Sequence, residues 1–305
     1  MRASQAQTRL RIGIDLGGSK IAGIVLGEDD AILASERRAA PQHDYAATIA
    51  AIAGMVQALA QSAGGPGSVG IGMPGSIAPG GGVQNANSTW LNGKPFASDL
   101  EACLKVPVRL ANDANCFALS EAADGAGAGA RSLFGVILGT GCGGGLVFNG
   151  SLLDGPRGTG GEWGHNPLPW ATADEHPGPL CWCGRRGCIE RWVSGPGLEA
   201  DHQQQTGVAL SAAAIAAGAA LGAADARAAL ERHASRLARG LAHVVNIFDP
   251  EVVVLGGGLS QLGHLYASLP PLMAPYILAH DTSVVIKSPR WGDASGVRGA
   301  ARLWP

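Results

Sequence analysis

Charged side chains are scarce in this chain, and neither sign dominates. Only 15% of the 305 residues are Asp, Glu, Lys or Arg, and the formal net charge is −2. Disordered chains combine low hydrophobicity with high net charge, whereas 46% of this chain is hydrophobic. Nucleic-acid-binding proteins usually carry a basic face, which this composition does not favour. We therefore expect a folded protein that binds no nucleic acid.

Long apolar runs are also missing. No stretch reaches the 18 consecutive apolar residues of a membrane span, and residues 1–10 lack the apolar core of a signal peptide. We therefore expect a cytoplasmic protein that contacts no membrane. A chain of 305 residues exceeds what one hydrophobic core usually holds, which favours two lobes.

Glycine, by contrast, is abundant, with 47 residues and no collagen-like period of three. Many of these glycines lie in turns between short apolar strands. A strand, a glycine-rich turn and a returning strand occur at residues 12–26 and again at residues 136–148. Each is followed by a series of helices and strands. This repeat predicts two similar α/β lobes with a cleft between them.

The two glycine turns offer closely spaced backbone N–H groups that can hold phosphate oxygens. In the first turn, residues 15–20, Asp15 could orient a Mg²⁺ ion and Ser19 could donate to a phosphate. Alternatively, the glycines of this turn only make a tight hairpin bend. The second turn, residues 139–145, has five glycines in seven positions, more than a plain hairpin needs. Together the turns could hold one nucleoside triphosphate from both sides.

Two further features follow predicted strands. Asn112 and Asp113 stand at the end of a strand over residues 106–110, where ligand sites of open α/β sheets gather. The Asp113 carboxylate could act as the general base of phosphoryl transfer, or it could only cap the following helix. Glycines 256–258 would let the backbone pass close to an adenine or ribose, or would only form a strand-to-helix turn.

Three of the six cysteines crowd into residues 181–188. Thiolates together with one imidazole form closed tetrahedral zinc sites. We predict that a structural zinc ion is held by His165, Cys181, Cys183 and Cys188. The alternative is three packed core cysteines and an unrelated histidine. The remaining three, Cys103, Cys116 and Cys142, are expected to be ordinary buried thiols.

From residue 10 to residue 304 the chain resembles the ROK sugar kinases, a family named for repressors, open-reading-frame proteins and kinases. The motifs that carry the resemblance occur in the family's order: residues 15–20, 112–115, 139–145, 161–165, 181–188 with Glu190, and 256–258. The resemblance implies an α/β, two-lobed, actin-like (ribonuclease H-like) ATPase fold with an interlobe cleft. We expect a small lobe over residues 10–121 plus 291–305, and a large lobe over residues 122–290 that includes the zinc-binding segment.

The resemblance also implies transfer of the ATP γ-phosphate to a hexose hydroxyl, with ATP, Mg²⁺ and the structural Zn²⁺ as cofactors. It makes Asp113 the catalytic base. It places contacts to the sugar at Asn87, Asn112, Asp113, Glu162, His165 and Glu190. Contacts to the nucleotide are expected at Asp15, Gly17, Gly18, Ser19, Lys20, Gly139, Thr140, Gly141, Gly143, Gly257 and Gly258. His165 would bind zinc through one ring nitrogen and the sugar through the other.

Two departures from the family's pattern are mild. Ser19 stands where threonine is usual, which keeps the hydroxyl, and about ten extra residues precede the first strand.

Within the family, residues 85–93 and 161–170 resemble the bacterial fructokinases with mannokinase activity. We therefore expect phosphorylation of the 6-hydroxyl of D-fructose, with mannose as a second substrate, by a homodimer. Glucose and N-acetylglucosamine are the alternative substrates, because hexoses differ in the position of single hydroxyls and motif spelling does not decide between them.

Two other classes of protein are disfavoured. A sugar-responsive repressor needs a helix-turn-helix domain before the first strand, where only about ten polar residues stand. A non-catalytic zinc-stabilised binding module would tolerate loss of the base and of the phosphate turns, yet all of them are present.

Overall fold

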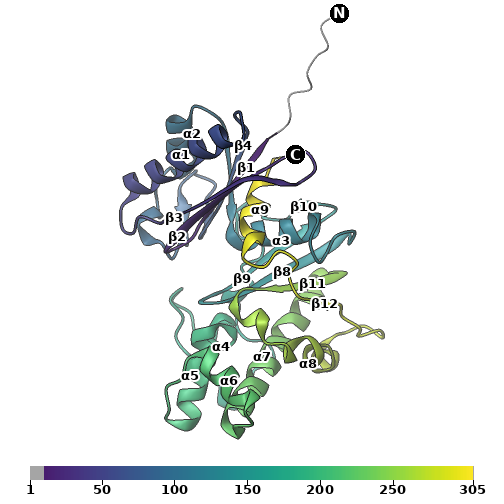
Figure 1. Cartoon of the computed structure of the whole chain (residues 1–305). Coiled ribbons are helices and arrows are strands. Elements are labelled where there is room, and N and C mark those ends of the chain that lie inside the picture. Colours follow the sequence, from purple (N-terminus) through teal and green to yellow (C-terminus); the bar gives the residue numbers. More distant parts are fainter. Residues whose placement is uncertain (1–9, 305) are drawn as a thin grey trace, which may run out of the picture. The chain divides into compact units, whose positions relative to one another are not determined.

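The computed structural model describes residues 10–304, which form two compact units (Figure 1). Unit 1 comprises residues 10–120, 154–160 and 293–304, and unit 2 comprises residues 121–153 and 161–292. Residues 154–160, which were expected in the large lobe, therefore belong to the first unit by their contacts. Residues 1–9, on which the prediction of no signal peptide rests, lie outside the described residues.

Unit 1 contains a five-stranded sheet in the order β3-β2-β1-β4-β7. The first three strands along the chain pair antiparallel, and the last two extend the sheet parallel to β1. The strands are β1 (Arg11–Leu16), β2 (Lys20–Leu26), β3 (Ile32–Ala39), β4 (Ser68–Met73) and β7 (Val108–Asn112). A short antiparallel pair, β5 (Ser76–Ile77) and β6 (Val83–Gln84), follows β4.

Helices cover both faces of this sheet. On one face, α1 (Tyr45–Ser62) packs Met55 and Leu59 into a core with Ile14 and Ile71. On the other face lies α9 (Ser295–Ala301), the yellow helix of Figure 1, although it comes from the far end of the chain. A Cβ atom added at Gly70 would lie 1.9 Å from the Ala300 carbonyl oxygen, so only glycine lets α9 lie directly on β4. The remaining helices are η1 (Thr89–Leu91), α2 (Phe96–Leu104), α3 (Asp113–Ala123) and η6 (Gly292–Ala294), which directly precedes α9.

Unit 2 repeats this topology. Its sheet has the order β10-β9-β8-β11-β12, again with two antiparallel pairings followed by two parallel ones. The strands are β8 (Ser132–Leu138), β9 (Cys142–Phe148), β10 (Ser151–Leu152), β11 (Val252–Gly256) and β12 (Ile286–Lys287). The predicted duplication of an α/β arrangement is therefore confirmed.

The second glycine turn is shorter than expected. Residues 142–145 were expected in the turn, but they belong to β9 and pair with β8. A Cβ atom at Gly144 would lie 2.7 Å from Cδ1 of Trp163, so the glycine makes room for the packed indole. The prediction of a seven-residue turn was wrong because part of the glycine run serves side-chain packing within a strand.

The helices of unit 2 gather around α7 (Ala224–Phe248), whose Leu237, Ala238 and Leu241 are fully buried. Its other helices are α4 (Glu190–Val193), α5 (Gly195–Thr206), α6 (Ala212–Ala220), η4 (Gly258–Gln261), α8 (His264–Met273) and η5 (Ala274–Tyr276). Within residues 10–304, no single helix has the length and apolar character of a membrane span. The pair α6 and α7 meets that criterion only when taken together, and it is bent by 117°.

Residues 161–193 contain little regular structure, with only η2 (Trp163–His165), η3 (Ala173–Glu175) and the short α4. Ion pairs join this segment to α7. The Glu175 carboxylate, whose side chain is 6% exposed, accepts hydrogen bonds from Arg236 Nε at 2.9 Å and from Arg239 Nη1 and Nη2 at 2.7 and 2.8 Å. Burial alone raises the pKa of Glu175, but the bonds from Arg239 and Arg236 outweigh it and lower the pKa to about 2.

Candidate functional site

The first glycine turn joins β1 to β2 in unit 1. The Gly17 amide donates to the Lys20 carbonyl oxygen at 3.0 Å, which closes the turn. Gly18, Ser19 and Lys20 are exposed, and no heavy atom lies within 4 Å of a Cβ atom added at Gly18. The open backbone of this turn can therefore approach a ligand closely.

Two carboxylates lie near each other below this turn. Asp15, on β1, has its pKa raised to about 6, first by burial and then by the negative charge of Asp113, against the opposing effect of Lys20 and Arg37. Burial likewise raises the pKa of Asp113, while hydrogen bonds from the Ala114 and Asp113 amides and from Asn112 oppose the shift. Paired acids with raised pKa values bind cations readily and are typical of functional sites.

Asp113 is the first residue of α3, directly after β7. The Ala114 amide donates to both Asn112 Oδ1 at 2.9 Å and Asp113 Oδ1 at 2.8 Å. Asn112 also donates through Nδ2 to the Gly75 carbonyl oxygen at 3.1 Å. The cap of α3 is thus shared between Asn112 and Asp113. Because Asn112 also caps the helix, the cap alone does not require an aspartate at position 113.

Asn87, an expected sugar contact, is exposed on the loop between β6 and η1. The loop is closed by Asn92, whose Oδ1 accepts from the Ala86 amide at 2.9 Å and whose Nδ2 donates to the Ala86 carbonyl oxygen at 3.0 Å. The side chain of Asn87 is therefore presented by a braced loop of unit 1.

In unit 2, the turn between β8 and β9 lies beside two other glycine-containing segments. The Gly195 amide, at the start of α5, donates to the Gly139 carbonyl oxygen at 2.8 Å. Gly257 has a φ of 77°, and an added Cβ atom would lie 2.4 Å from the Leu138 carbonyl oxygen. Exposed Thr140 and these backbones share the carboxyl ends of β8 and β11, where ligands of open α/β sheets bind.

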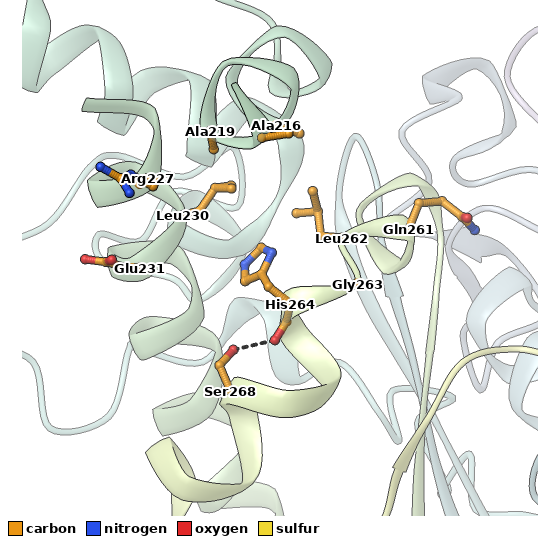
Figure 2. A pocket seen from close by; sticks show the side chains of 11 residues that line it. Ala216, Ala219, Arg227, Leu230, Glu231, Gln261, Leu262, Gly263, His264 and Ser268 are labelled. Atoms are coloured by element: carbon orange, nitrogen blue, oxygen red, sulfur yellow. Dashed lines mark hydrogen bonds between the residues drawn. The ribbon is translucent and has the colours of Figure 1, made fainter. Parts of the chain in front are cut away.

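A pocket of about 590 Å³ opens next to this edge, beyond the turn that contains Gly257 and Gly258. Figure 2 shows Ala216 and Ala219 of α6 on one side and His264 of α8 on the other, with Leu262 beside them. Burial lowers the pKa of His264, so its imidazole is neutral near pH 7. Small apolar walls with a few polar groups suit a flat aromatic ligand.

The predicted zinc ligands converge. One ligand atom each from His165, Cys181, Cys183 and Cys188 lies within 4.8 Å of the other three. The Nδ1 atom of His165 is 3.6 Å from Cys181 Sγ, and Cys183 Sγ is 3.6 Å from Cys188 Sγ. Ligands about 2.0–2.3 Å from a tetrahedral zinc ion would stand roughly 3.5–3.8 Å apart, so the donor set and its spacing fit zinc.

The other cysteines do not join this cluster. Cys116 and Cys142 are buried, as expected, whereas Cys103 is exposed on α2, so the prediction that it is buried was wrong. Burial, followed by the charges of Asp15 and Asp113, raises the pKa of Cys116 well above its usual value. The thiol of Cys116, on α3, therefore stays protonated.

Glu190 begins α4 and stands between the cysteine cluster and the glycine turn of unit 2. Its Oε2 accepts from the Cys142 amide at 3.0 Å, and its Oε1 accepts from the Trp182 indole Nε1 at 2.8 Å. Glu162, the other expected acidic sugar contact of this unit, precedes η2 and is partly buried. The segment 161–193 thus brings Glu190 and the predicted zinc ligands to one region of unit 2.

Some contributing residues gave no signal in the sequence. Residues 212–229 look like plain alanine-rich helix, yet α6 and α7 line the pocket. Trp182 lies between two zinc ligands, and only the three-dimensional contact with Glu190 distinguishes it from any exposed tryptophan. Neither property follows from local residue pattern.

A model of the ROK family matches residues 11–305. N-acetyl-D-glucosamine kinase from Pasteurella multocida is 38% identical over 97% of this chain and 99% of its own length, and the one from Vibrio cholerae is 40% identical over 95% and 98%. Among solved structures, the ROK hexokinase from Thermus thermophilus superposes with a TM-score of 0.85, 31% identity and 96% coverage of both chains. A ROK family glucokinase from Streptomyces griseus, solved with glucose and AMPPNP, has a TM-score of 0.78 and 27% identity, covering 96% of this chain and 98% of its own.

The raised pKa of Asp15 predicts a stabilising effect of Asp15→Asn. The folded-state pKa of about 6 exceeds the usual 3.8, so ionised Asp15 destabilises the fold fully above pH 6 and not at all below pH 3.8. We expect the variant to gain about 3 kcal/mol in the free energy of unfolding at pH 8, and the gain to shrink as the pH falls toward 4. Urea denaturation at several pH values measures this. A loss of stability at every pH would instead identify Asp15 as a structural partner.

Proposed function

The chain belongs to the ROK family, and we propose that within this family of sugar kinases it phosphorylates N-acetyl-D-glucosamine with ATP. The observation that carries the proposal is the match, over at least 95% of the chain, to N-acetyl-D-glucosamine kinases at 38–40% identity. The actin-like ATPase fold, duplicated in the two units, is shared with the ROK hexokinase and glucokinase structures.

Fructose was the substrate expected from residues 85–93 and 161–170. The curated relatives instead support the alternative that was kept beside it, N-acetylglucosamine. The two loops are short, whereas the matches to N-acetylglucosamine kinases run through both units, so we give the relatives the greater weight.

Asp113 is the proposed catalytic base. Its raised pKa increases its affinity for a proton, which suits a carboxylate that deprotonates a sugar hydroxyl. As the 6-hydroxyl oxygen bonds to the γ-phosphorus, the bond from that phosphorus to the β,γ-bridging oxygen breaks. The hydroxyl proton passes to Asp113, and ADP leaves. Asn112 fixes the backbone at this position by capping α3 and bonding to Gly75.

The glycine turns are the proposed phosphate contacts. The exposed backbone at Gly18 and at Thr140 can present amide N–H groups to phosphate oxygens. Asp15 would hold Mg²⁺, since a bound cation offsets the burial and the repulsion from Asp113 that raise its pKa. When bound, Mg²⁺ would neutralise charge on the phosphate oxygens.

We assign the adenine ring to the pocket between α6 and α8. The pocket begins at Gln261 and Leu262, immediately after the expected nucleotide contacts Gly257 and Gly258. Alanine side chains from α6 leave a flat wall on the opposite side (Figure 2). A ribose near Gly257 would therefore carry its base into this pocket.

The cysteine–histidine cluster is the proposed structural zinc site. Four protein ligands close a tetrahedral shell, so no position remains for a substrate oxygen. Since Nδ1 of His165 faces Cys181, its Nε2 is the nitrogen left to contact the sugar. The homodimer expected from the sequence stays a prediction.

A panel of hexoses assayed with Mg²⁺ and ATP tests the proposed substrate. We expect kcat/KM for N-acetylglucosamine to exceed that for glucose, mannose and fructose by at least about tenfold. A site that bonds the acetamido group leaves buried polar groups unpaired when a sugar lacks that group. ADP release in a coupled assay measures the rates. A preference for fructose would support the loop-based alternative.

Asp113→Asn is the control for chemistry in this panel. It keeps the side-chain shape but removes the base, so kcat should fall by at least about 100-fold, while sugar affinity changes far less. Near-normal kcat would place the base elsewhere.

The adenine pocket is tested by Ala216→Trp, which places an indole in the pocket from α6. We expect KM for ATP to rise by about tenfold or more, because the base and the indole compete for the same space, with KM for the sugar unchanged. Ala217→Trp is the matched control, since Ala217 is exposed on the same helix and lies outside the pocket. Equal effects of the two substitutions would contradict the assignment.

The zinc site is tested by Cys183→Ser. The variant should lose most of its zinc. It should also bind the sugar more weakly, because the zinc ion helps to fix the conformation of residues 161–193, whereas nucleotide binding should change little. Cys103→Ser, an exposed cysteine outside the cluster, should behave as wild type. Elemental analysis and titration calorimetry supply the measurements. Fully active wild-type enzyme with under about a tenth of an equivalent of zinc would end the hypothesis.

A further inference from the structure

Trp182 is exposed, yet its side chain contacts two residues of the same segment, Glu190 and His165. Its side chain is among the exposed large hydrophobic groups, at 60%. Even so, its indole N–H donates to Glu190 Oε1 at 2.8 Å, and its ring meets the His165 ring edge-on, with centroids 4.7 Å apart. Water could satisfy an exposed indole N–H, so burial does not explain why the indole bonds to Glu190.

Glu190 is a carboxylate held only by neutral donors. The Cys142 amide donates to its Oε2, the Trp182 indole donates to its Oε1, and no ion pair to it occurs within residues 10–304. A Cβ atom at Gly141 would lie 2.9 Å from Oε2, so the glycine turn leaves room for the carboxylate. An ionised carboxylate has about four acceptor sites, of which two are used. The other two are available to hydroxyl groups.

The backbone around Trp182 is itself fixed. The Cys181 amide donates to the Arg185 carbonyl oxygen at 2.8 Å, and the Gly184 amide donates to the Cys181 carbonyl oxygen at 3.0 Å. Trp182 therefore projects from a tight turn, and a side chain on such a base can hold a neighbour in one orientation.

We propose that Trp182 is a positioning residue for the sugar. Its N–H holds the Glu190 carboxylate against the glycine turn of unit 2, so that the two free acceptor sites meet hydroxyls of the sugar ring. The indole beside His165 forms an aromatic wall of the same subsite. The proposal rests on the proposed function in taking Glu190 and His165 as sugar contacts, but it holds for whichever hexose is preferred.

The test compares Trp182→Phe, Glu190→Gln and the double variant by calorimetric titration with the hexose that the panel identifies. Binding is measured because catalytically weak variants still report it. Trp182→Phe keeps an aromatic ring and loses the N–H, so the sugar Kd should rise about tenfold. In the Glu190→Gln background the same change should alter Kd less than threefold, because Trp182 acts through Glu190. ATP affinity, zinc content and thermal stability should match wild type.

Trp170→Phe is the matched control. Trp170 is a second exposed tryptophan of the same segment, but its ring contacts Tyr276 and His243 instead. Sugar affinity should be unchanged in this variant.

A second measurement covers the case in which Glu190→Gln binds sugar too weakly to titrate. In the wild-type protein, the Trp182 indole N–H resonance, assigned by its loss in Trp182→Phe, should shift when sugar is added and not when ATP alone is added. An unshifted resonance, or a Trp182→Phe Kd within twofold of wild type, overturns the positioning role while leaving the kinase proposal intact. If the wild-type protein phosphorylated no hexose, the proposed function would be contradicted instead. The Trp182 resonance, measured with the same sugars, would still test whether Trp182 lies at a sugar-binding site.

Discussion

The fixed conformation of residues 161–193 depends on the ion pairs between Glu175 and two arginines of α7, Arg236 and Arg239. This segment has almost no backbone ladder of its own, so side chains must hold it. Arg239 reaches both the Glu175 carboxylate and the Trp170 carbonyl oxygen, and Arg236 joins Glu175 to Asp201 while lying over the Trp192 ring at 4.5 Å. The Glu175 carboxylate can be buried because both of its oxygens accept hydrogen bonds from arginines. These bonds outweigh the effect of burial, which is why the pKa of Glu175 is low. With this anchor on α7 and the cysteine–histidine cluster at the other end, an irregular chain can keep Glu162, His165 and Glu190 in fixed positions.

Unit 1 shows the opposite electrostatic arrangement. Asp15 and Asp113 lie near each other without a full set of cationic partners, and the pKa of each is raised. Such a pair costs stability in the free protein. Such a pair is useful where a ligand brings a positive charge or donates a proton to one of the carboxylates, as a hydroxyl does in phosphoryl transfer. Glu175, fully paired, and Asp15, poorly paired, thus show two opposite electrostatic settings of a carboxylate within a single chain.

The duplicated topology explains why glycine turns occur twice. Each unit begins with an antiparallel hairpin followed by parallel strands, and each hairpin turn opens at the carboxyl end of the strand that pairs in parallel. The chain is a ROK family sugar kinase, and this arrangement belongs to its fold. The choice of sugar does not belong to the fold, because hexoses differ in single substituents, and a site tells them apart by which of its polar groups each substituent pairs. For this reason the two loops and the relatives can point to different sugars, fructose and N-acetylglucosamine, without affecting the family assignment.

Much of this protein could be read from local pattern. The strand–turn–strand patterns predicted at residues 12–26 and 136–148 are matched by the pairs β1–β2 and β8–β9, because strand alternation and turn glycines act within a few residues. The fold family could be inferred because its motifs occur in the family's order along the chain. The clustering of Cys181, Cys183 and Cys188 could be inferred because they lie within residues 181–188, and the chemistry of the donor set added His165. The exposure of Cys103, the entry of residues 142–145 into β9, the pocket on α6 and the bond from Trp182 to Glu190 could not be inferred. The strand at residues 142–145 and the pocket depend on atoms far apart in sequence, since Trp163 fills the space beside Gly144 and α8 faces α6. The bond from Trp182 spans eight residues, but its partner Glu190 is set in place by the Cys142 amide at the start of β9. Local residue type sets what a segment can form, but packing between distant segments decides which faces are covered and which side chains meet.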